Sequence, residues 1–133
     1  MKIITVLIFA ISFAYSEAYS QEWGMYSTDG ELKIEYKKVE CVDIANGIYQ
    51  EKVLFRYTNL TEREIEKDIL VRGTYNNKGK VYQTQPDVSF KLSLPGGKRV
   101  EGTCDEKEKA LCLFSRMLDI ESSQLLEFEV KLK

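Results

Sequence analysis

Residues 127–133 read Glu-Phe-Glu-Val-Lys-Leu-Lys, a strict alternation of charged and apolar side chains that decides the fold class. Successive side chains of a β-strand point to opposite faces, so this stretch predicts a strand with one buried and one solvated face. The same period of two recurs in residues 31–36, 52–57 and 88–94. Its apolar positions there are Leu32, Ile34 and Tyr36, then Val53, Phe55 and Tyr57, then Val88, Phe90, Leu92 and Leu94. Repeated short alternating segments indicate an all-β protein.

Turn-forming sequences separate the alternating segments. They are Asn46-Gly47, the run Asn76-Asn77-Lys78-Gly79, and Leu94-Pro95-Gly96-Gly97. With these boundaries we expect seven strands, near residues 31–42, 49–58, 64–74, 79–85, 87–94, 110–118 and 125–133. Seven antiparallel strands in about one hundred residues are typical of an immunoglobulin-like sandwich. We therefore predict an all-β, immunoglobulin-like β-sandwich domain over residues 31–133, after an irregular segment over residues 21–30.

Two of the seven segments also allow a helix. Residues 61–72 begin with Thr61 and Glu64 at the spacing of a capping box, but their apolar residues share a strand face, so we favour a strand. Residues 105–118 carry apolar side chains that fit either period, and we predict a strand over 110–118.

The apolar positions change phase by one residue between Tyr36 and Val39. A β-bulge at Lys37-Lys38 would restore the phase, because one inserted residue turns the later side chains to the other face. We therefore expect Val39 and Cys41 to continue toward the core.

The first twenty residues have the pattern of an export signal. A positive start, Met1-Lys2, precedes an apolar run from Ile3 to Tyr15 and a small, polar end at Ala18-Tyr19-Ser20. The run is shorter than the roughly 20 residues that a membrane-spanning helix needs, so we favour a signal peptide over residues 1–20 against an anchor. The first cysteine is Cys41, so we expect no lipid attachment, and we expect no membrane span after cleavage.

Length and charge exclude several classes of protein. The chain has 133 residues, of which 19 are basic and 21 acidic, a net charge of −2. Removing Lys2 and Glu17 with the signal leaves 18 basic and 20 acidic residues, again −2. This balance offers no basic field to attract nucleic acid, so we expect no nucleic-acid partner. The remaining length fits one domain.

Three cysteines allow at most one internal disulfide. Pairing Cys41 with Cys104 would contribute roughly 4 kcal/mol in the chain-entropy model, against roughly 2.5 kcal/mol for Cys104 with Cys112. The gain alone does not decide which bond forms. Cys104 lies in a polar stretch, whereas Cys112 lies in the apolar run 110–114. We therefore predict a Cys41–Cys104 disulfide and a free, buried thiol at Cys112.

Several short motifs lie beside the predicted strands. They are Asp29-Gly30, the stretch 38–43 around Cys41, Asn59 with Thr61, and Leu94-Pro95-Gly96 leading to Gly102-Thr103-Cys104. In these features the chain resembles small exported bacterial proteins with an immunoglobulin-like sandwich, a type common among Bacteroidetes. The resemblance implies a fold and a compartment outside the cytoplasm, and it transfers no catalytic residue to this chain.

The residues that usually carry catalysis are few. The chain has no histidine, which removes the usual base for a catalytic serine or cysteine and a common metal ligand. Its cysteines form no Cys-x-x-Cys pair, and no Asp-x-Asp-x-Asp calcium loop occurs, although scattered carboxylates leave calcium open. We expect a protein that is not an enzyme and that has no metal site and no cofactor.

Two polar motifs have alternative interpretations. Asn59-Leu60-Thr61 has the form of an N-glycosylation site, but we favour a role in shaping the turn after the second strand. A candidate binding surface around the predicted hairpin turn comprises Tyr75, Asn76, Asn77, Lys80 and Tyr82. Side chains that merely cover the edge of the core are the alternative for this surface.

Together these observations predict a secreted or periplasmic, non-enzymatic binding or structural module. We expect its partner to be a protein of the cell envelope or an extracellular glycan. A carbohydrate-binding module and a secreted protease inhibitor are the alternatives.

Overall fold

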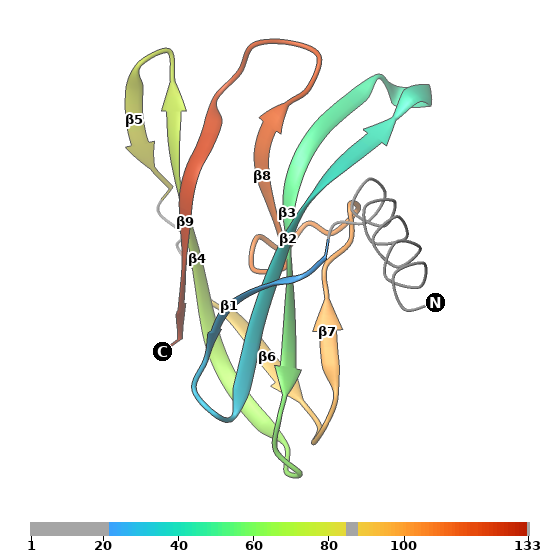
Figure 1. Ribbon diagram of the computed structural model, residues 1–133, viewed down its shortest axis with the longest axis vertical. Helices are drawn as coiled ribbons and strands as arrows, with labels where there is room; N and C mark the ends of the chain where they lie inside the picture. The colour runs from blue at the N-terminus through green and yellow to red at the C-terminus, as the bar shows by residue number, and fades with distance from the viewer. Residues whose placement is uncertain (1–21, 85–87, 133) are drawn as a thin grey trace, which may run out of the picture.

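The computed structural model describes residues 22–84 and 88–132, which form two antiparallel β-sheets facing each other (Figure 1). The five-stranded sheet contains β1 (Gly24–Thr28), β2 (Leu32–Asp43), β3 (Ile48–Asn59), β7 (Arg99–Glu101) and β8 (Cys112–Met117). The four-stranded sheet contains β4 (Ile65–Asn77), β5 (Lys80–Gln83), β6 (Phe90–Leu94) and β9 (Gln124–Leu132). The predicted all-β sandwich is confirmed.

The strand count differs from the prediction at two places. β1 lies within residues 21–30, which we expected to be irregular, and it pairs with β2. β7 has only three residues, too few to show a period of two in the sequence. The two segments that also allowed a helix are strands, β4 and β8. The predicted signal peptide, residues 1–20, lies outside the described residues. In the described part of the chain, no helix has both the length and the apolar character needed to cross a membrane.

Each sheet is organised around one long strand. One side of β3 pairs with β2, and the other side is shared by β7 and β8. Likewise, β4 pairs with β9 on one side and with β5 and β6 on the other. At the junction on β3, Phe55 accepts a hydrogen bond from Gly102 N–H at 2.9 Å and donates one to the Leu111 carbonyl at 3.0 Å. A Cβ at Gly102 would overlap that Leu111 carbonyl, so only glycine allows this junction.

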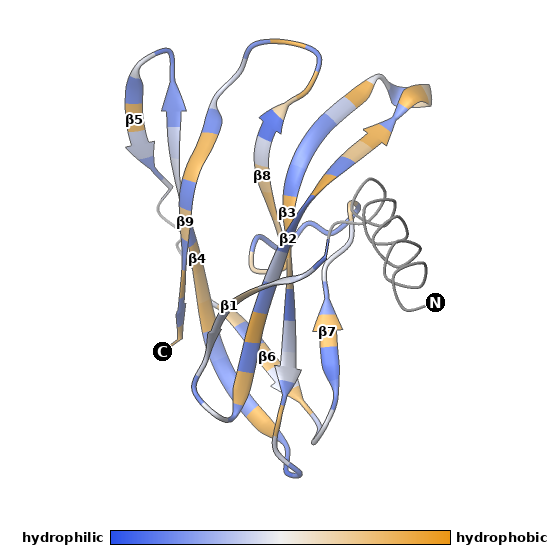
Figure 2. Ribbon diagram, in the orientation of Figure 1, coloured by the Kyte–Doolittle hydropathy of each residue, from blue (hydrophilic) through white to orange (hydrophobic). Residues whose placement is uncertain are grey.

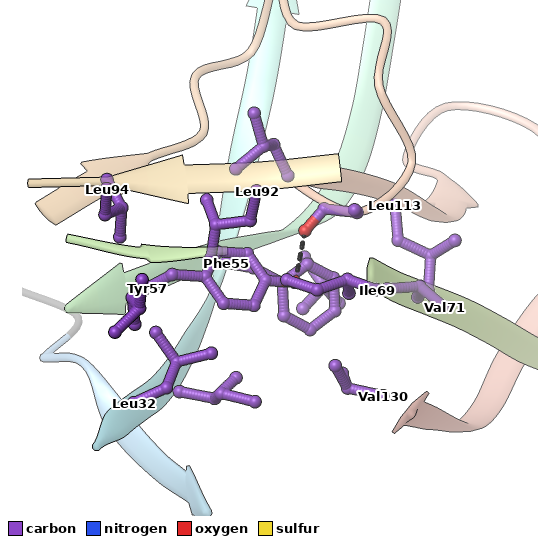
Figure 3. Close-up of a cluster of buried hydrophobic side chains, with 14 residues drawn as sticks. Leu32, Phe55, Tyr57, Ile69, Val71, Leu92, Leu94, Leu113 and Val130 are labelled. Atoms are coloured by element: carbon purple, nitrogen blue, oxygen red, sulfur yellow. Dashed lines mark hydrogen bonds between the residues drawn. The ribbon is translucent and has the colours of Figure 1, made fainter. Parts of the chain in front are cut away.

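The core fills the space between the sheets (Figure 3). Its fully buried side chains include Leu32, Ile34, Val53, Phe55, Tyr57, Ile69 and Leu92. The Phe128 ring lies between the sheets, with its centroid 5.2 Å from that of Phe55 and 5.3 Å from that of Tyr36. The Tyr57 hydroxyl donates a 2.6 Å hydrogen bond to the Ala110 carbonyl, and burial raises the pKa of this tyrosine. The alternating residues seen in the sequence therefore do form the core.

The predicted bulge at Lys37-Lys38 is wrong. The β2–β3 register runs without a shift from Leu32 opposite Asn59 to Asp43 opposite Ile48. Val39 and Cys41 therefore lie on the face of β2 opposite to Leu32 and Ile34. Cys41 is buried on that outer face because its disulfide partner Cys104 covers it. The apolar residues change phase along β2 because its inner face is covered near Leu32, whereas its outer face is covered near Cys41.

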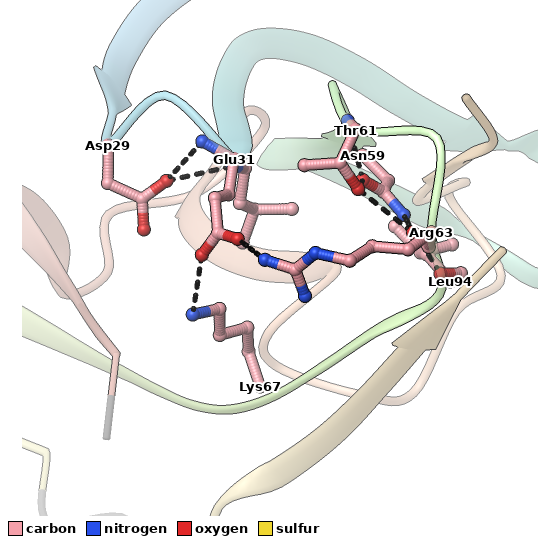
Figure 4. A network of polar contacts seen from close by, with 8 residues as sticks. Asp29, Glu31, Asn59, Thr61, Arg63, Lys67 and Leu94 are labelled. Carbon is pink, nitrogen blue, oxygen red and sulfur yellow. Dashed lines mark hydrogen bonds and ion pairs between the residues drawn. The ribbon is translucent and has the colours of Figure 1, made fainter. Parts of the chain in front are cut away.

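One end of the sandwich, formed by residues 29–31, 59–64 and 94–98 and called here the closed end, is joined by hydrogen bonds (Figure 4). The Asn59 side chain is 1% exposed, and its amide nitrogen lies 2.8, 3.0 and 3.1 Å from the carbonyls of Arg63, Leu94 and Pro95. Its oxygen accepts hydrogen bonds from the Thr61 N–H at 2.9 Å and hydroxyl at 2.7 Å. The predicted turn-shaping role of Asn59 and Thr61 is confirmed.

Candidate binding cleft

A cleft of about 370 Å³ is lined by residues of β5 and β8, among others. These two strands lie in the half of the sandwich away from the closed end (Figure 1). The volume of the cleft lies in the range of small-ligand sites. The four-stranded sheet contributes Tyr75 and Tyr82, with Thr84 just after β5. The five-stranded sheet and the segment 102–111 contribute Gln50, Lys52, Glu106, Lys107, Lys109, Cys112, Leu113 and Phe114. We call this region the cleft.

Three aromatic rings line the cleft, those of Tyr75 and Tyr82 from the four-stranded sheet and that of Phe114 from the five-stranded sheet. The Tyr75 and Tyr82 rings stack with centroids 5.6 Å apart and planes 21° apart, because the two residues are directly opposite across β4 and β5. Phe114 continues the row, with its centroid 6.5 Å from that of Tyr75. Tyr75 is 5% exposed but Tyr82 is 44% exposed. A ligand in the cleft would therefore meet the Tyr82 ring first.

The position of the Tyr75 ring depends on a hydrogen bond of its hydroxyl and on the small size of Gly73. Its hydroxyl donates a 2.7 Å hydrogen bond to the Phe114 carbonyl of β8. Gly73 leaves room for the ring, since a Cβ there would lie 2.8 Å from Tyr75 Cε2. Burial, with a smaller effect of Tyr82, raises the pKa of Tyr75 to about 12. Tyr75 is therefore a neutral hydrogen-bond donor that links the two sheets beside the cleft.

The predicted binding surface around the hairpin turn is divided by the structure. Tyr75 and Tyr82 face the cleft, but Tyr75 is buried. Asn77 and Lys80 pair one step farther out, next to the turn, and do not line the cleft. Asn76 points to the other face, and its side-chain oxygen accepts the Gly79 N–H at 2.9 Å. Four of the five predicted residues therefore share one face of the hairpin and Asn76 lies on the other, and their role in binding stays a prediction.

The segment 102–111 also lines the cleft and is anchored by a disulfide. Cys41 and Cys104 are bonded, with their Cα atoms 5.6 Å apart, as predicted. Lys52 Nζ donates a 3.0 Å hydrogen bond to the Cys104 carbonyl. Unlike the inter-sheet bridge of antibody domains, this disulfide ties β2 to a loop on the outside of one sheet. The cross-link therefore holds the segment that carries the charged residues of the cleft.

Cys112 is free and 7% exposed, and it lies at the cleft beside Lys52. Burial raises the pKa of its thiol, although the Lys52 charge opposes this shift and Glu106 adds to it. A protonated thiol is a weak nucleophile. Among the described residues that line the cleft, Glu106 is the single carboxylate, whereas a glycosidase needs two facing each other. The cleft therefore offers contact surface and hydrogen bonds.

The charge of the cleft is opposite in sign to that of the chain. Lys52, Lys107 and Lys109 contribute three positive charges and Glu106 one negative charge, a net +2, while the whole chain has −2. Lys107 and Lys109 are exposed, and they line the cleft from the segment before β8. Within residues 22–84 and 88–132, no three His, Cys, Asp or Glu side chains are grouped so that they could hold a metal ion.

Most of the cleft was not predicted from the sequence, because Tyr75 and Tyr82 alone among its lining residues belong to the predicted binding surface. Phe114 was assigned only to a strand, and Lys52, Lys107 and Lys109 appeared as ordinary surface lysines. No local sequence pattern indicates that residues near positions 52, 82 and 107 lie close together in the folded chain. The disulfide was the available signal, because it places the residues that follow Cys104 beside the end of β2.

Comparisons with protein families, with curated proteins and with solved structures give no match.

Proposed function

We propose that the protein is an exported, non-enzymatic binding module that holds a saccharide in the cleft against Tyr82. The exposed Tyr82 ring, stacked on the buried Tyr75 ring inside a cleft of about 370 Å³, is the observation that carries this proposal. A sugar ring has an apolar C–H face that packs on an aromatic ring, and its hydroxyls need polar partners nearby. Gln50 offers such a partner in the cleft, whereas the Thr84 hydroxyl is already hydrogen-bonded to the Gly73 backbone.

The position of Tyr82 favours binding because little freedom is lost when a ligand arrives. One face of the ring packs on Tyr75, and the hydroxyl lies 3.3 Å from Ser123 Oγ. A preorganised side chain avoids part of the entropic cost of binding. Tyrosine also gives a large contact area with few rotatable bonds. A binding role requires no activated group, in agreement with the protonated thiol of Cys112.

The proposed location is outside the cytoplasm, either secreted or periplasmic. The Cys41–Cys104 disulfide supports it, because such bonds persist mainly in oxidising compartments. The signal-like pattern of residues 1–20 gives independent support from the sequence.

The test is isothermal titration calorimetry of the protein with a panel of oligosaccharides. The Tyr82→Ala variant should lose about tenfold or more in affinity, since aromatic contacts of this size contribute one to several kcal/mol. Val81→Ala is the matched control, because Val81 is also exposed on β5 but points to the opposite face. Equal binding by wild type and Tyr82→Ala, or no binding of any saccharide, would overturn the proposal.

A second candidate function is binding of an envelope protein through the tip of the β2–β3 hairpin. Val42, Ile44 and Ile48 are 47%, 77% and 39% exposed there and form the apolar tip (Figure 2). Exposed apolar clusters of this kind often mark protein interaction sites.

An affinity pull-down from envelope extracts tests this second function. A partner that is lost with Ile44→Asp but kept with Tyr82→Ala would support it, and a partner kept by both variants would contradict it. The protease-inhibitor alternative is tested with a panel of secreted proteases, and it fails if the protein slows none of them.

A further inference from the structure

We infer that the cleft selects anionic saccharides, in which a carboxylate or sulfate group lies between Lys52 and the pair Lys107 and Lys109 while the sugar ring packs on Tyr82. This inference rests on the proposed function and specifies the ligand class for the same site. Its basis is the position and the pairing of the three lysines.

Among the residues that the structure describes, no carboxylate forms an ion pair with a lysine of the cleft. Among the ion pairs of the described residues, Lys33 and Lys67 contact carboxylates within 4.0 Å, but Lys52, Lys107 and Lys109 do not. Glu106 is near them, yet one of its carboxylate oxygens faces the Glu108 N–H at 3.4 Å. The cleft therefore keeps a positive charge available to a ligand.

Lys52 supplies a fixed charge deep in the cleft. Its Nζ is held at 3.0 Å from the Cys104 carbonyl, and the disulfide holds Cys104 itself. An ammonium has three N–H donors, so two remain for a ligand. The effect of Lys52 on the pKa of Cys112 agrees with a position next to that thiol. The charge is thus placed on the same side of the cleft as Phe114, within the wall that faces Tyr82.

Lys107 and Lys109 supply mobile charges at the rim. Both side chains are exposed and lie on the segment 102–111, which comes from the other sheet than Tyr82. Long lysine side chains can follow an anionic group without a fixed geometry, so the cleft would accept either a planar carboxylate or a tetrahedral sulfate. Because the whole chain is net negative, attraction at long range is weak, and at physiological salt charges are screened beyond about 8 Å. The selection therefore acts on groups inside the cleft.

The experiment compares three oligosaccharides of equal length by calorimetry: a neutral galactose oligomer, its sulfated form, and the corresponding galacturonate oligomer. At about 20 mM salt at least one acidic ligand should bind roughly tenfold more tightly than the neutral one, and the ratio should fall at about 150 mM salt because of screening. The arm that binds more tightly identifies the anion. Equal affinity for all three ligands would overturn this inference and leave the proposed function intact, whereas no binding of any ligand would overturn the proposed function itself.

The double variant Lys107→Gln/Lys109→Gln separates charge from general contact. It should lose most of the preference for the acidic ligand, about fivefold to tenfold, and keep its affinity for the neutral one. Lys98→Gln/Lys131→Gln removes two exposed lysines outside the cleft and serves as the control. If both double variants reduce the acidic preference equally, the cleft lysines are not the selecting groups.

Discussion

The closed end and the cleft half of the sandwich are held together by different kinds of contact. At the closed end, the turns approach so closely that a Cβ on Gly96 would overlap the backbone of Glu62, and Asn59 fills its hydrogen bonds with backbone groups. In the cleft half, the contacts are a disulfide, side-chain hydroxyls and stacked rings. Direct backbone contact at the closed end leaves no space between the sheets. The side-chain and disulfide contacts of the other half leave a cleft between them. The difference separates a stabilising end from a region that can hold a ligand.

The largest expected effect is at the closed end. Asn59→Ala removes the donors and the acceptor that satisfy several buried backbone groups, and each unsatisfied group costs about 1–3 kcal/mol. We expect a loss of about 4 kcal/mol in the free energy of unfolding, measured by urea denaturation.

The control for this variant is Asn46→Ala. Asn46 lies in an exposed turn, where its side chain bonds only to Asp43 among the described residues, and its loss should cost below about 1 kcal/mol. Equal costs for the two variants would mean that the closed end has no special role in stability.

The disulfide should contribute slightly less, and its effect should be local. Cys41→Ala/Cys104→Ala should cost about 3 kcal/mol. Because the bond anchors the segment 102–111, hydrogen exchange should show lost protection in this segment, with protection at the closed end retained. A uniform loss of protection would contradict the separation of the two regions. In the wild type, alkylation of the denatured, unreduced protein should label Cys112 alone.

The hydroxyl of Tyr75 provides a smaller and pH-dependent contribution to the cleft half. Tyr75→Phe removes the hydrogen bond to Phe114 and should cost about 1 kcal/mol near neutral pH. The pKa of Tyr75 is raised from 10.0 to about 12 by burial, so the neutral form stabilises the fold below pH 10 and this contribution is lost as pH rises toward 12. The cost of Tyr75→Phe should therefore shrink between these pH values. A constant cost would show that the hydroxyl does not titrate with folding.

The smallest effect is expected in the turn at residues 29–31. Asp29 Oδ1 accepts the N–H groups of Glu31 and Leu32, both at 2.8 Å, which lowers the pKa of Asp29 below 3.8. A lowered pKa means stability that is present above 3.8 and lost as pH falls through the folded value. Asn keeps the acceptor oxygen, so Asp29→Asn should cost a few tenths of a kcal/mol at neutral pH and should lose less stability in acid. Parallel acid denaturation curves for the two proteins would contradict this account.

Sequence and structure agree most closely where the pattern is local. The alternation around Phe55 and Phe128 predicted strands that do form the core, and Asn59 with Thr61 predicted the turn that the closed end contains. The change of phase after Tyr36 was misread as a bulge, because a pattern of polarity cannot state which side of a strand is covered. β7 was missed because its three residues are too few to show a strand period in the sequence.

By itself, the sequence determined the all-β class and the main turns, since each of these depends on nearby residues. It favoured the pairing of Cys41 with Cys104 from the polarity around each cysteine, and the structure shows this bond. Only the tertiary structure decided that Tyr82, Phe114 and three lysines meet in one cleft. The physical reason is that a strand exposes both of its faces to the rest of the chain, and packing between distant segments decides what each face contacts. The turn of Asn59 and Thr61 could thus be predicted from the order of its residues, whereas the joining of the closed end to Leu94 and the formation of the cleft exist only in the packed sandwich.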